Sequence, residues 1–201
     1  MTSDWRRRRK DHFSKMAKKE NYRSRASFKL LEAIRKYGFI RDGDVVVDLG
    51  AYPGGWLQVA REIVGDNGFV LGVDLRKIEH LGFDNVQTII GDILDRETVN
   101  RIKAILPRQA DAVISDVSPN VSGVWEVDHA RQIELAERSL SIAISILRVG
   151  GSFFVKVFRG ELFEEYLKHV KNFFLDVRVF KPKASRTESA EIYVLGLNYQ
   201  A

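Results

Sequence analysis

A single lysine interrupts an otherwise apolar run in the last third of the chain. Lys156 lies within GSFFVKVF, residues 151–158, between Val155 and Val157. This composition is typical of a strand inside an α/β sheet, where helices cover both faces. An ammonium group buried there has a large desolvation cost unless it pairs with carboxylates or lines a cleft. At a cleft, a lysine can orient a reacting hydroxyl or accept its proton. The sequence therefore predicts charged partners for Lys156.

Three charged residues are candidates for these partners. Asp116 ends the predicted strand 111–117, which we expect to lie beside the Lys156 strand. Glu191 begins a predicted strand at 191–199, and Lys29 lies on a predicted helix at 24–37. The carboxyl ends of parallel strands meet at one rim of a sheet, and an antiparallel strand starts at that rim. We therefore expect the four residues to converge, although Asp116 alone would suit a turn and Lys29 alone an exposed helix face.

A glycine-rich turn supplies a second candidate site. Residues 45–58, VVVDLGAYPGGWLQ, pass from an apolar strand through Gly50, Pro53, Gly54 and Gly55 into a helical pattern. In an open α/β sheet, the first strand-to-helix turn faces the crevice where ligands bind. The glycines lack the G-x-G-x-x-G spacing of a dinucleotide site, and no Gly-Lys-Ser/Thr follows as in a P-loop. The turn therefore predicts a small ligand held without a pyrophosphate cradle.

Two carboxylates end the strands that follow this turn. Asp74 lies near the end of FVLGVDL, 69–75, and Asp92 ends VQTIIGD, 86–92. A carboxylate in the position of Asp74 can accept hydrogen bonds from both hydroxyls of a ribose. Asp92 could take the exocyclic amine of a purine. Each alone would also suit a helix cap or a turn, but beside the glycine turn they indicate a nucleoside.

The rest of the chain alternates between strand and helix patterns. Helices are predicted at 24–37, directly after Trp56, and at 96–106, 128–148 and 161–174. Strands are predicted from Val45 and at 69–75, 86–92, 111–117, 151–158, 176–180 and 191–199. This alternation predicts an α/β fold with a mostly parallel seven-stranded sheet and helices on both faces. Because no helix separates the last two strands, we expect the last strand to enter antiparallel.

Positive charge is concentrated at the N-terminus. The 201-residue chain has a net charge of +5, yet residues 1–25 hold ten Lys or Arg against three acids, a net charge of +7. Trp5, Phe13 and Tyr22 are interleaved with these charges. Such a segment is typical of a nucleic-acid-binding arm whose aromatic rings stack on unpaired bases. A solvated tail has the same composition, so this alternative stays open.

Composition excludes several other functions. The chain has no cysteine, which removes disulfides, thiolate nucleophiles and cysteine-bound zinc, and its four histidines are too scattered for a metal site. No apolar run approaches the roughly 20 residues of a membrane span, and the N-terminus is arginine-rich where a signal peptide is apolar. We expect a cytoplasmic protein with no metal and no membrane partner.

Seven segments, in unbroken order from about residue 20 to the C-terminus, are similar to those of a known family. They are YRSRASFKLLE (22–32), VVVDLGAYPGGWLQ, the VDL at Asp74, the GD at Asp92, SDVSPN (115–120), FFVKVF around Lys156 and SRTESAEIYVLG (185–196). On these motifs the chain resembles the FtsJ/RrmJ (RlmE) family of ribosomal RNA 2'-O-methyltransferases. The resemblance implies a Rossmann-like class I methyltransferase domain at 26–201 and a basic RNA-binding arm at 1–25. It also implies S-adenosyl-L-methionine as cofactor and a monomer that methylates a ribose, expected to be a uridine, in large-subunit ribosomal RNA.

The resemblance also implies residue roles. Lys29, Asp116, Lys156 and Glu191 match the catalytic tetrad, with Lys156 as base or hydroxyl orienter and Lys29 and Glu191 as positioning groups. Asp116 is the partner of Lys156 and contacts the methionine end of the cofactor. Among the cofactor-binding residues, Gly54 and Trp56 hold the cofactor at the turn, Asp74 its ribose and Asp92 its adenine. Trp56 would alternatively suit the core. Tyr52 departs from the Ala common in the family, which puts local loop packing in doubt more than cofactor binding.

Three other functions stay open at this point. A related enzyme class methylates riboses of the tRNA anticodon loop, and the core motifs barely distinguish it. A non-catalytic RNA-binding ribosome-assembly factor could retain a vestigial site, although the complete tetrad argues against this. A metal-dependent small-molecule O-methyltransferase could use Asp116 and Asn120 as oxygen ligands, but it would leave the basic arm unexplained.

Overall fold

The computed structural model describes residues 12–185 and 189–201. Residues 12–19 are helical and precede the labelled elements. These are α2 (Ser27–Tyr37), β1 (Val45–Leu49), α3 (Gly55–Val64), β2 (Phe69–Asp74), β3 (Val86–Ile90), α4 (Arg96–Ile105), β4 (Ala110–Ser115), α5 (Trp125–Ile146), β5 (Leu147–Phe158), α6 (Phe163–Lys171), β6 (Phe174–Phe180) and β7 (Glu191–Tyr199). Residues 1–11 of the predicted arm, Trp5 among them, and positions 186–188 of the last motif lie outside the described residues.

The described strands form one seven-stranded sheet in the order β3-β2-β1-β4-β5-β7-β6. β1 pairs in parallel with β2 and β4, and the β2–β3 and β4–β5 pairs are also parallel. β7 runs antiparallel to both of its neighbours, β5 and β6. The sequence prediction of a mostly parallel sheet whose last strand enters antiparallel is therefore confirmed.

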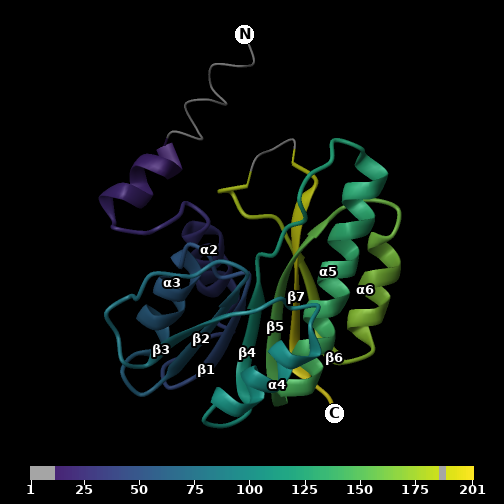
Figure 1. Ribbon diagram of the computed structural model, residues 1–201. Helices are drawn as coiled ribbons and strands as arrows, with labels where there is room; N and C mark the ends of the chain where they lie inside the picture. Colours follow the sequence, from purple (N-terminus) through teal and green to yellow (C-terminus); the bar gives the residue numbers. More distant parts are fainter. Residues whose placement is uncertain (1–11, 186–188) are drawn as a thin grey trace.

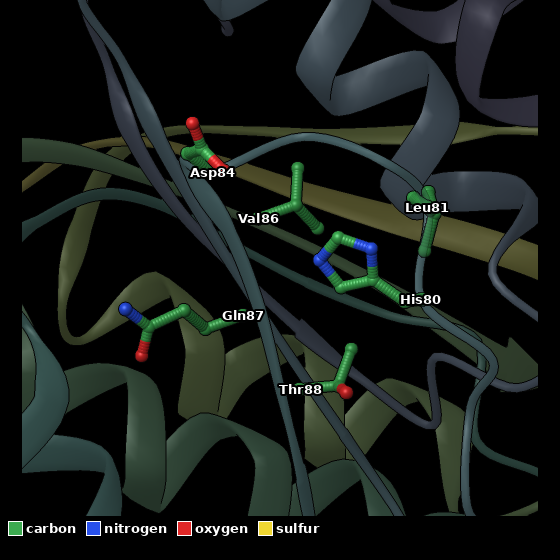
Figure 2. Close-up of a pocket in the computed structure, with 6 residues that line it drawn as sticks. All are labelled: His80, Leu81, Asp84, Val86, Gln87 and Thr88. Carbon is green, nitrogen blue, oxygen red and sulfur yellow. The ribbon is translucent and has the colours of Figure 1, made fainter.

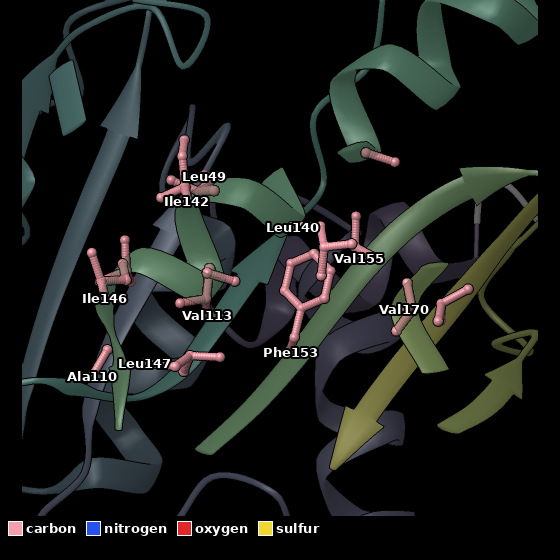
Figure 3. Close-up of a cluster of buried hydrophobic side chains, with 14 of the residues drawn as sticks. Leu49, Ala110, Val113, Leu140, Ile142, Ile146, Leu147, Phe153, Val155 and Val170 are labelled. Atoms are coloured by element: carbon pink, nitrogen blue, oxygen red, sulfur yellow. The ribbon is translucent and has the colours of Figure 1, made fainter. Parts of the chain in front are cut away.

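Helices cover both faces of this sheet, so there are two hydrophobic cores (Figure 1). On one face, Leu140 of α5 and Val170 of α6 join Phe153 of β5 in the first core (Figure 3). On the other face, Leu30 of α2 and Leu57 of α3 join the second core. Fully burying an apolar side chain of this size contributes about 1.5–3 kcal/mol, so these two layers hold the sheet in place.

The alternation of side chains along β5 determines the face of the sheet on which Lys156 lies. Phe153, Val155 and Val157 belong to the first core, whereas Phe154 belongs to the second. Successive strand residues point to opposite faces. Lys156 therefore lies on the face that α2 and α3 cover.

The helix boundaries differ from the predicted ones at both ends of α5. The helix begins at Trp125 rather than 128, because the Asp128 carboxylate accepts hydrogen bonds from the Ser122 and Gly123 N–H groups and stabilises an earlier first turn. It ends at Ile146, because Leu147 already pairs with Ala110 across the sheet. The predicted strand 151–158 thus extends back to Leu147.

The described half of the basic arm packs against the domain. Ala17 is buried in the second core, and the rings of Phe13 and Tyr22 lie 5.8 and 5.7 Å from the Phe28 ring of α2. Two of the three aromatic residues expected to stack on bases thus have partners within the protein. No helix in the described part of the chain is long and apolar enough to cross a membrane.

Candidate active site

The carboxyl rim of the sheet brings the four predicted charged residues together. Lys156 on β5 is in register with Tyr193 on β7, and Phe158 is in register with Glu191. Asp116 directly follows β4, the parallel neighbour of β5. The helix α2 crosses this face and supplies Lys29, which is buried.

A continuous series of polar contacts links these side chains. Lys29 Nζ lies 2.6 Å from Glu191 Oε1 and donates a 3.2 Å hydrogen bond to the Tyr193 hydroxyl. That hydroxyl donates to Asp116 Oδ1 over 2.7 Å. Lys156 Nζ lies 3.2 Å from the same Oδ1 and donates a 2.7 Å hydrogen bond to the Asp116 carbonyl oxygen. Lys156 therefore contacts Asp116 directly, and Lys29 is linked to it through the Tyr193 hydroxyl.

Opposing effects set the charge of Asp116. Burial would raise the pKa of the Asp116 carboxyl, but the Lys156 and Lys29 ammonium groups and the Tyr193 hydrogen bond outweigh it and hold the pKa below its ordinary value. Burial, with the nearby charges of Asp116 and Glu191, raises the pKa of Tyr193 well above its ordinary value. Tyr193 therefore stays neutral and can keep donating its proton to Asp116.

Tyr193 was not among the residues predicted for this site. It is fully buried and stacks on Phe154 at 4.8 Å, so its ring also belongs to the core. The sequence did contain a signal, because Tyr193 follows Glu191 by two positions on a strand and must face the same side. An aromatic residue in an apolar strand is nevertheless typical of a core.

A cavity of about 570 Å³ lies beside these contacts. Its lining includes Gly50, Asp74, Asp92, Asp116 and Asn120, which lie at or just after the ends of β1, β2, β3 and β4. The volume is within the range of small-molecule sites. Three of the predicted ligand-binding carboxylates therefore face one cavity.

The glycine turn closes one side of this cavity. Gly50 has φ +78°, and a Cβ there would lie 2.7 Å from a side-chain carbon of Val117, which also lines the cavity. A side chain at this position would be strained and would push into the segment after β4. The absence of a side chain thus lets the turns after β1 and β4 approach each other.

The backbone orients the two carboxylates opposite the turn. Asp74 Oδ2 accepts a 3.0 Å hydrogen bond from the Tyr52 N–H, and Oδ1 accepts a 2.9 Å bond from the Arg76 N–H. Asp92 Oδ1 accepts from the Leu94 N–H over 2.9 Å. The cap of α4 is Asp95 instead, whose carboxylate accepts from Glu97 N–H. Both aspartates keep further acceptor lone pairs for a ligand.

Gly54 and Trp56 are placed differently from the expected cofactor contacts. Neither lines this cavity. The Trp56 indole is buried, donates from Nε1 to the Ala26 carbonyl oxygen over 2.8 Å and stacks on Phe154 at 5.8 Å. The structure thus favours the core alternative for the Trp56 ring, because an indole that links α2 to α3 has its polar group already bonded.

Tyr52, the departure from the family pattern, packs at the edge of the same cavity. Its ring is 42% exposed, and the Arg76 guanidinium lies 3.7 Å above the ring centroid. Both residues line the cavity. The larger side chain therefore adds a wall next to Asp74 and leaves the glycine turn intact.

A second, smaller hollow of about 370 Å³ lies at the β3 edge of the sheet (Figure 2). It is lined by His80, Leu81 and Asp84 from the preceding loop and by residues 86–88 of β3. It contains none of the predicted site residues. Within residues 12–185 and 189–201, no three His, Asp or Glu side chains gather closely enough to hold a metal ion.

The known proteins to which this chain is similar are described as methyltransferases. The FtsJ-like methyltransferase family matches residues 22–199. Ribosomal RNA large subunit methyltransferase E of Methanothrix thermoacetophila is 55% identical over 187 residues, covering 93% of this chain and 72% of that protein. The enzyme of the same name from Methanocaldococcus jannaschii is 49% identical over 195 residues, covering 96% and 80%. A Plasmodium falciparum protein provisionally described as a ribosomal RNA methyltransferase has a TM-score of 0.78 and 29% identity, covering 89% of this chain and 98% of that one.

Methyltransferases of this fold use S-adenosyl-L-methionine, and the cavity fits it. If S-adenosyl-L-methionine is bound here, Asp74 would offer carboxylate oxygens to its ribose, Asp92 an acceptor to its adenine amine, and Asp116 a negative charge to its sulfonium or amino group. A structure of the same fold, from Streptococcus mutans, was solved with S-adenosylhomocysteine at 14% identity and a TM-score of 0.52. With this fold, this cavity and these matches, the chain belongs to the FtsJ-like methyltransferase family.

Proposed function

We propose that the chain methylates the 2'-hydroxyl of a ribose, at a uridine, in large-subunit ribosomal RNA. The printed activity of its relatives supports the RNA class. The observation that carries the ribose assignment is the Lys156 ammonium group, which is buried beside the cavity and anchored on Asp116. A hydroxyl acceptor must lose a proton during transfer, so its site needs a group of this kind.

In this proposal Lys156 acts on the acceptor rather than on the cofactor. Bound S-adenosyl-L-methionine supplies an electrophilic methyl group on a sulfonium. Lys156 would hold the acceptor hydroxyl through Nζ and, as the neutral amine, take the hydroxyl proton. The O–C bond would form as the S–C bond of the methyl donor breaks, which leaves S-adenosylhomocysteine. Asp116 fixes Lys156 by accepting from Nζ at both its carbonyl and its carboxylate oxygens. Alignment of this kind supplies much of the rate enhancement in transfer reactions.

Lys29, Tyr193 and Glu191 act as a supporting shell. Lys29 is held by Glu191, and Ser185 Oγ donates a 2.8 Å hydrogen bond to the same Glu191 oxygen. The Tyr193 hydroxyl accepts a hydrogen bond from Lys29 and donates one to Asp116, which fixes the position of the Asp116 carboxylate. The shell keeps Asp116 ionised and in place, so that Lys156 has a single orientation.

The basic arm, residues 1–25, serves as the RNA-binding segment in this proposal. Lys18 and Lys19 are exposed on the described helix at 12–19. Lysines of this kind neutralise backbone phosphates and make affinity depend on salt. We further propose that the enzyme works as a cytoplasmic monomer on the assembled or assembling large subunit.

A methylation assay with competing RNAs tests the substrate. Labelled cofactor is offered with intact large subunits, naked large-subunit RNA and tRNA, to the full chain and to a form lacking residues 1–11, which keeps the helix that buries Ala17. We expect label in large-subunit RNA, and in the shortened form a weaker, less salt-dependent RNA affinity with unchanged cofactor affinity. Label confined to tRNA would contradict the substrate assignment, and unchanged RNA affinity would return the arm to a solvated tail.

A further inference from the structure

Arg23 uses its guanidinium group within the protein, although it lies in the basic arm. Its Nη1 donates to the carbonyl oxygens of Pro53 and Glu79 over 3.2 and 2.6 Å, and its Nη2 donates to that of His80 over 2.9 Å. The Arg23 backbone N–H donates to the Gln58 side chain on α3 over 2.8 Å. A guanidinium engaged by three carbonyl oxygens has few donors left for an RNA phosphate.

The carbonyl groups that Arg23 binds come from the two segments that border the cofactor cavity. Pro53 follows Tyr52 in the glycine turn, and Glu79 and His80 follow Arg76 in the segment after β2. Tyr52 and Arg76 both line the cavity. Arg23 thus ties together two segments that are remote in sequence.

The same two segments are already joined on the cavity side. The Asp74 carboxylate accepts from the N–H groups of Tyr52 and Arg76, and the side chains of Tyr52 and Arg76 stack on each other. Asp74 therefore fixes the segments at one point and Arg23 at another. Two points of attachment restrict the angle between the segments, which one alone would leave free.

The glycine turn has room for Arg23. Gly54 has φ +109°, and a Cβ there would lie 3.0 Å from Arg23 Nη1 and 3.2 Å from its Cδ. A side chain at position 54 would strain the turn and push against the Arg23 side chain. This gives Gly54 a function although it does not line the cavity.

We propose that Arg23 is a positioning residue of the cofactor site, which holds the glycine turn against the segment after Asp74 and so sets the shape of the ribose end of the cavity. It acts on the adenosine part of the cofactor, so it serves the methyl donor and the demethylated product alike. It also connects the RNA-binding arm to the cofactor site. This role rests on the cofactor assignment and is independent of which RNA is methylated.

The test compares Arg23→Ala with Lys19→Ala, which removes one positive charge from the same arm at an exposed position. Calorimetry gives the Kd of S-adenosyl-L-methionine and of S-adenosylhomocysteine, and a salt titration gives RNA affinity. Arg23→Ala removes all three hydrogen bonds that link the two segments, and we expect it to weaken both cofactor forms by the same factor, at least about tenfold. Its KM for the cofactor should rise while kcat at saturation is retained. Lys19→Ala should keep wild-type cofactor affinity.

Arg23→Lys is the second variant and keeps the test valid if Arg23→Ala does not fold. A single ammonium group cannot reproduce the planar fork that spans three carbonyls, so we expect the Kd for both cofactor forms to rise here too. Full rescue by lysine, or unchanged cofactor affinity together with a larger loss of RNA affinity than in Lys19→Ala, would overturn the proposal for Arg23. Wild-type protein that binds no cofactor would instead overturn the cofactor assignment.

Discussion

The two ends of β4 carry aspartates with similar charge and opposite surroundings. At its beginning, Asp111 is bound by Arg108 at 2.6 Å and Arg148 at 2.5 Å. Immediately after its end, Asp116 is bound by Lys156 and Tyr193. In both cases burial would raise the pKa of the carboxyl and the partners outweigh it, so both pKa values lie below the ordinary range.

The difference lies in the cations. The arginine side chains at Asp111 are nearly half exposed, 48% and 47%, whereas the lysine at Asp116 is 6% exposed. Arginine cannot release its proton in a protein, so the pairs at Asp111 can only hold strands together. Lysine can exchange its proton, and burial makes its surroundings decisive. The exposed arginines at one end of β4 therefore suit a structural role, and the buried lysine at the other end is the one to which the proposed function assigns the acceptor proton.

Replacing Lys156 should have the largest effect and confine it to catalysis. We expect Lys156→Ala to lower kcat by about 10²–10⁴-fold, because it removes the group that takes or orients the acceptor proton. Calorimetry should show cofactor binding retained. Lys156→Arg keeps the charge but cannot accept a proton, so it should fail to restore turnover. Near-normal turnover in either variant would remove Lys156 from the mechanism.

Replacing Asp111 should give the opposite pattern. Asp111→Ala breaks two ion pairs and leaves the Val45 N–H, which donates to Asp111 over 2.7 Å, without its acceptor. We expect a loss of about 2–3 kcal/mol in the free energy of unfolding, with kcat unchanged. Urea unfolding and a saturated assay measure the two quantities.

The decrease in the free energy of unfolding at acidic pH gives a second test of Asp111. Because the folded pKa of Asp111 is lowered, the wild type gains stability above the unfolded pKa of about 3.9 and loses it as pH falls toward the folded value. Asp111→Ala should lose less stability than the wild type as pH falls. A variant that keeps wild-type acid sensitivity, or that loses activity while staying stable, would contradict the division between the two ends of β4.

Tyr193→Phe should have a smaller effect at the reactive end. It keeps the ring stacked on Phe154 but removes the hydrogen bonds to Lys29 and Asp116. We expect a roughly tenfold loss of kcat with little change in cofactor affinity, about the effect of one charged hydrogen bond. A thermal melt serves as control, and a loss of Tm without a loss of kcat would assign Tyr193 to the core alone.

Replacing Asp48 should have the smallest effect of these changes, and it should stabilise the protein rather than destabilise it. It lies on β1, fully buried, and in the described residues neither of its carboxylate oxygens has a hydrogen-bond partner. Burial, followed by the charges of Asp116 and Asp74, raises the pKa of Asp48 well above its ordinary value. Its contribution to stability is therefore complete below the unfolded pKa and declines as pH rises toward the folded pKa.

Asp48→Asn removes this penalty. At pH 8 we expect a Tm above that of the wild type by about 2–4 °C, the shift that ~1 kcal/mol gives in a chain of this size. At pH 4 the two proteins should melt together. A difference that does not grow with pH would show that Asp48 is not the titrating group.

The charged residues around Asp116, at the end of β4, could be predicted from the sequence better than the residues that support them. Lys156 was identifiable because an ammonium group in an apolar strand needs partners, and strand direction pointed to Asp116 and Glu191. The fold followed from the same alternation of elements. Lys29 was less certain, because a lysine on an amphipathic helix is usually exposed, and only the packing of α2 on the sheet buries it.

Other features could not be predicted because different roles leave the same pattern. An aromatic residue after a glycine turn suits a cofactor site or a core, and the burial of the Trp56 ring and its hydrogen bond to Ala26 became visible only in the structure. An arginine in a basic arm suits RNA, and the three carbonyl oxygens that bind Arg23 could not be read from the sequence. The unpaired carboxylate of Asp48 is visible only once the strand's neighbours are known.

The position of the transferred methyl group distinguishes methylation of the ribose 2'-hydroxyl from methylation of a base. Large-subunit RNA labelled by the wild-type protein is hydrolysed in alkali, which cleaves next to every free 2'-hydroxyl and spares the bond beside a 2'-O-methyl group. We expect the label in an alkali-resistant dinucleotide, and no label there with Lys156→Ala. Label recovered in a base-methylated mononucleotide would contradict it.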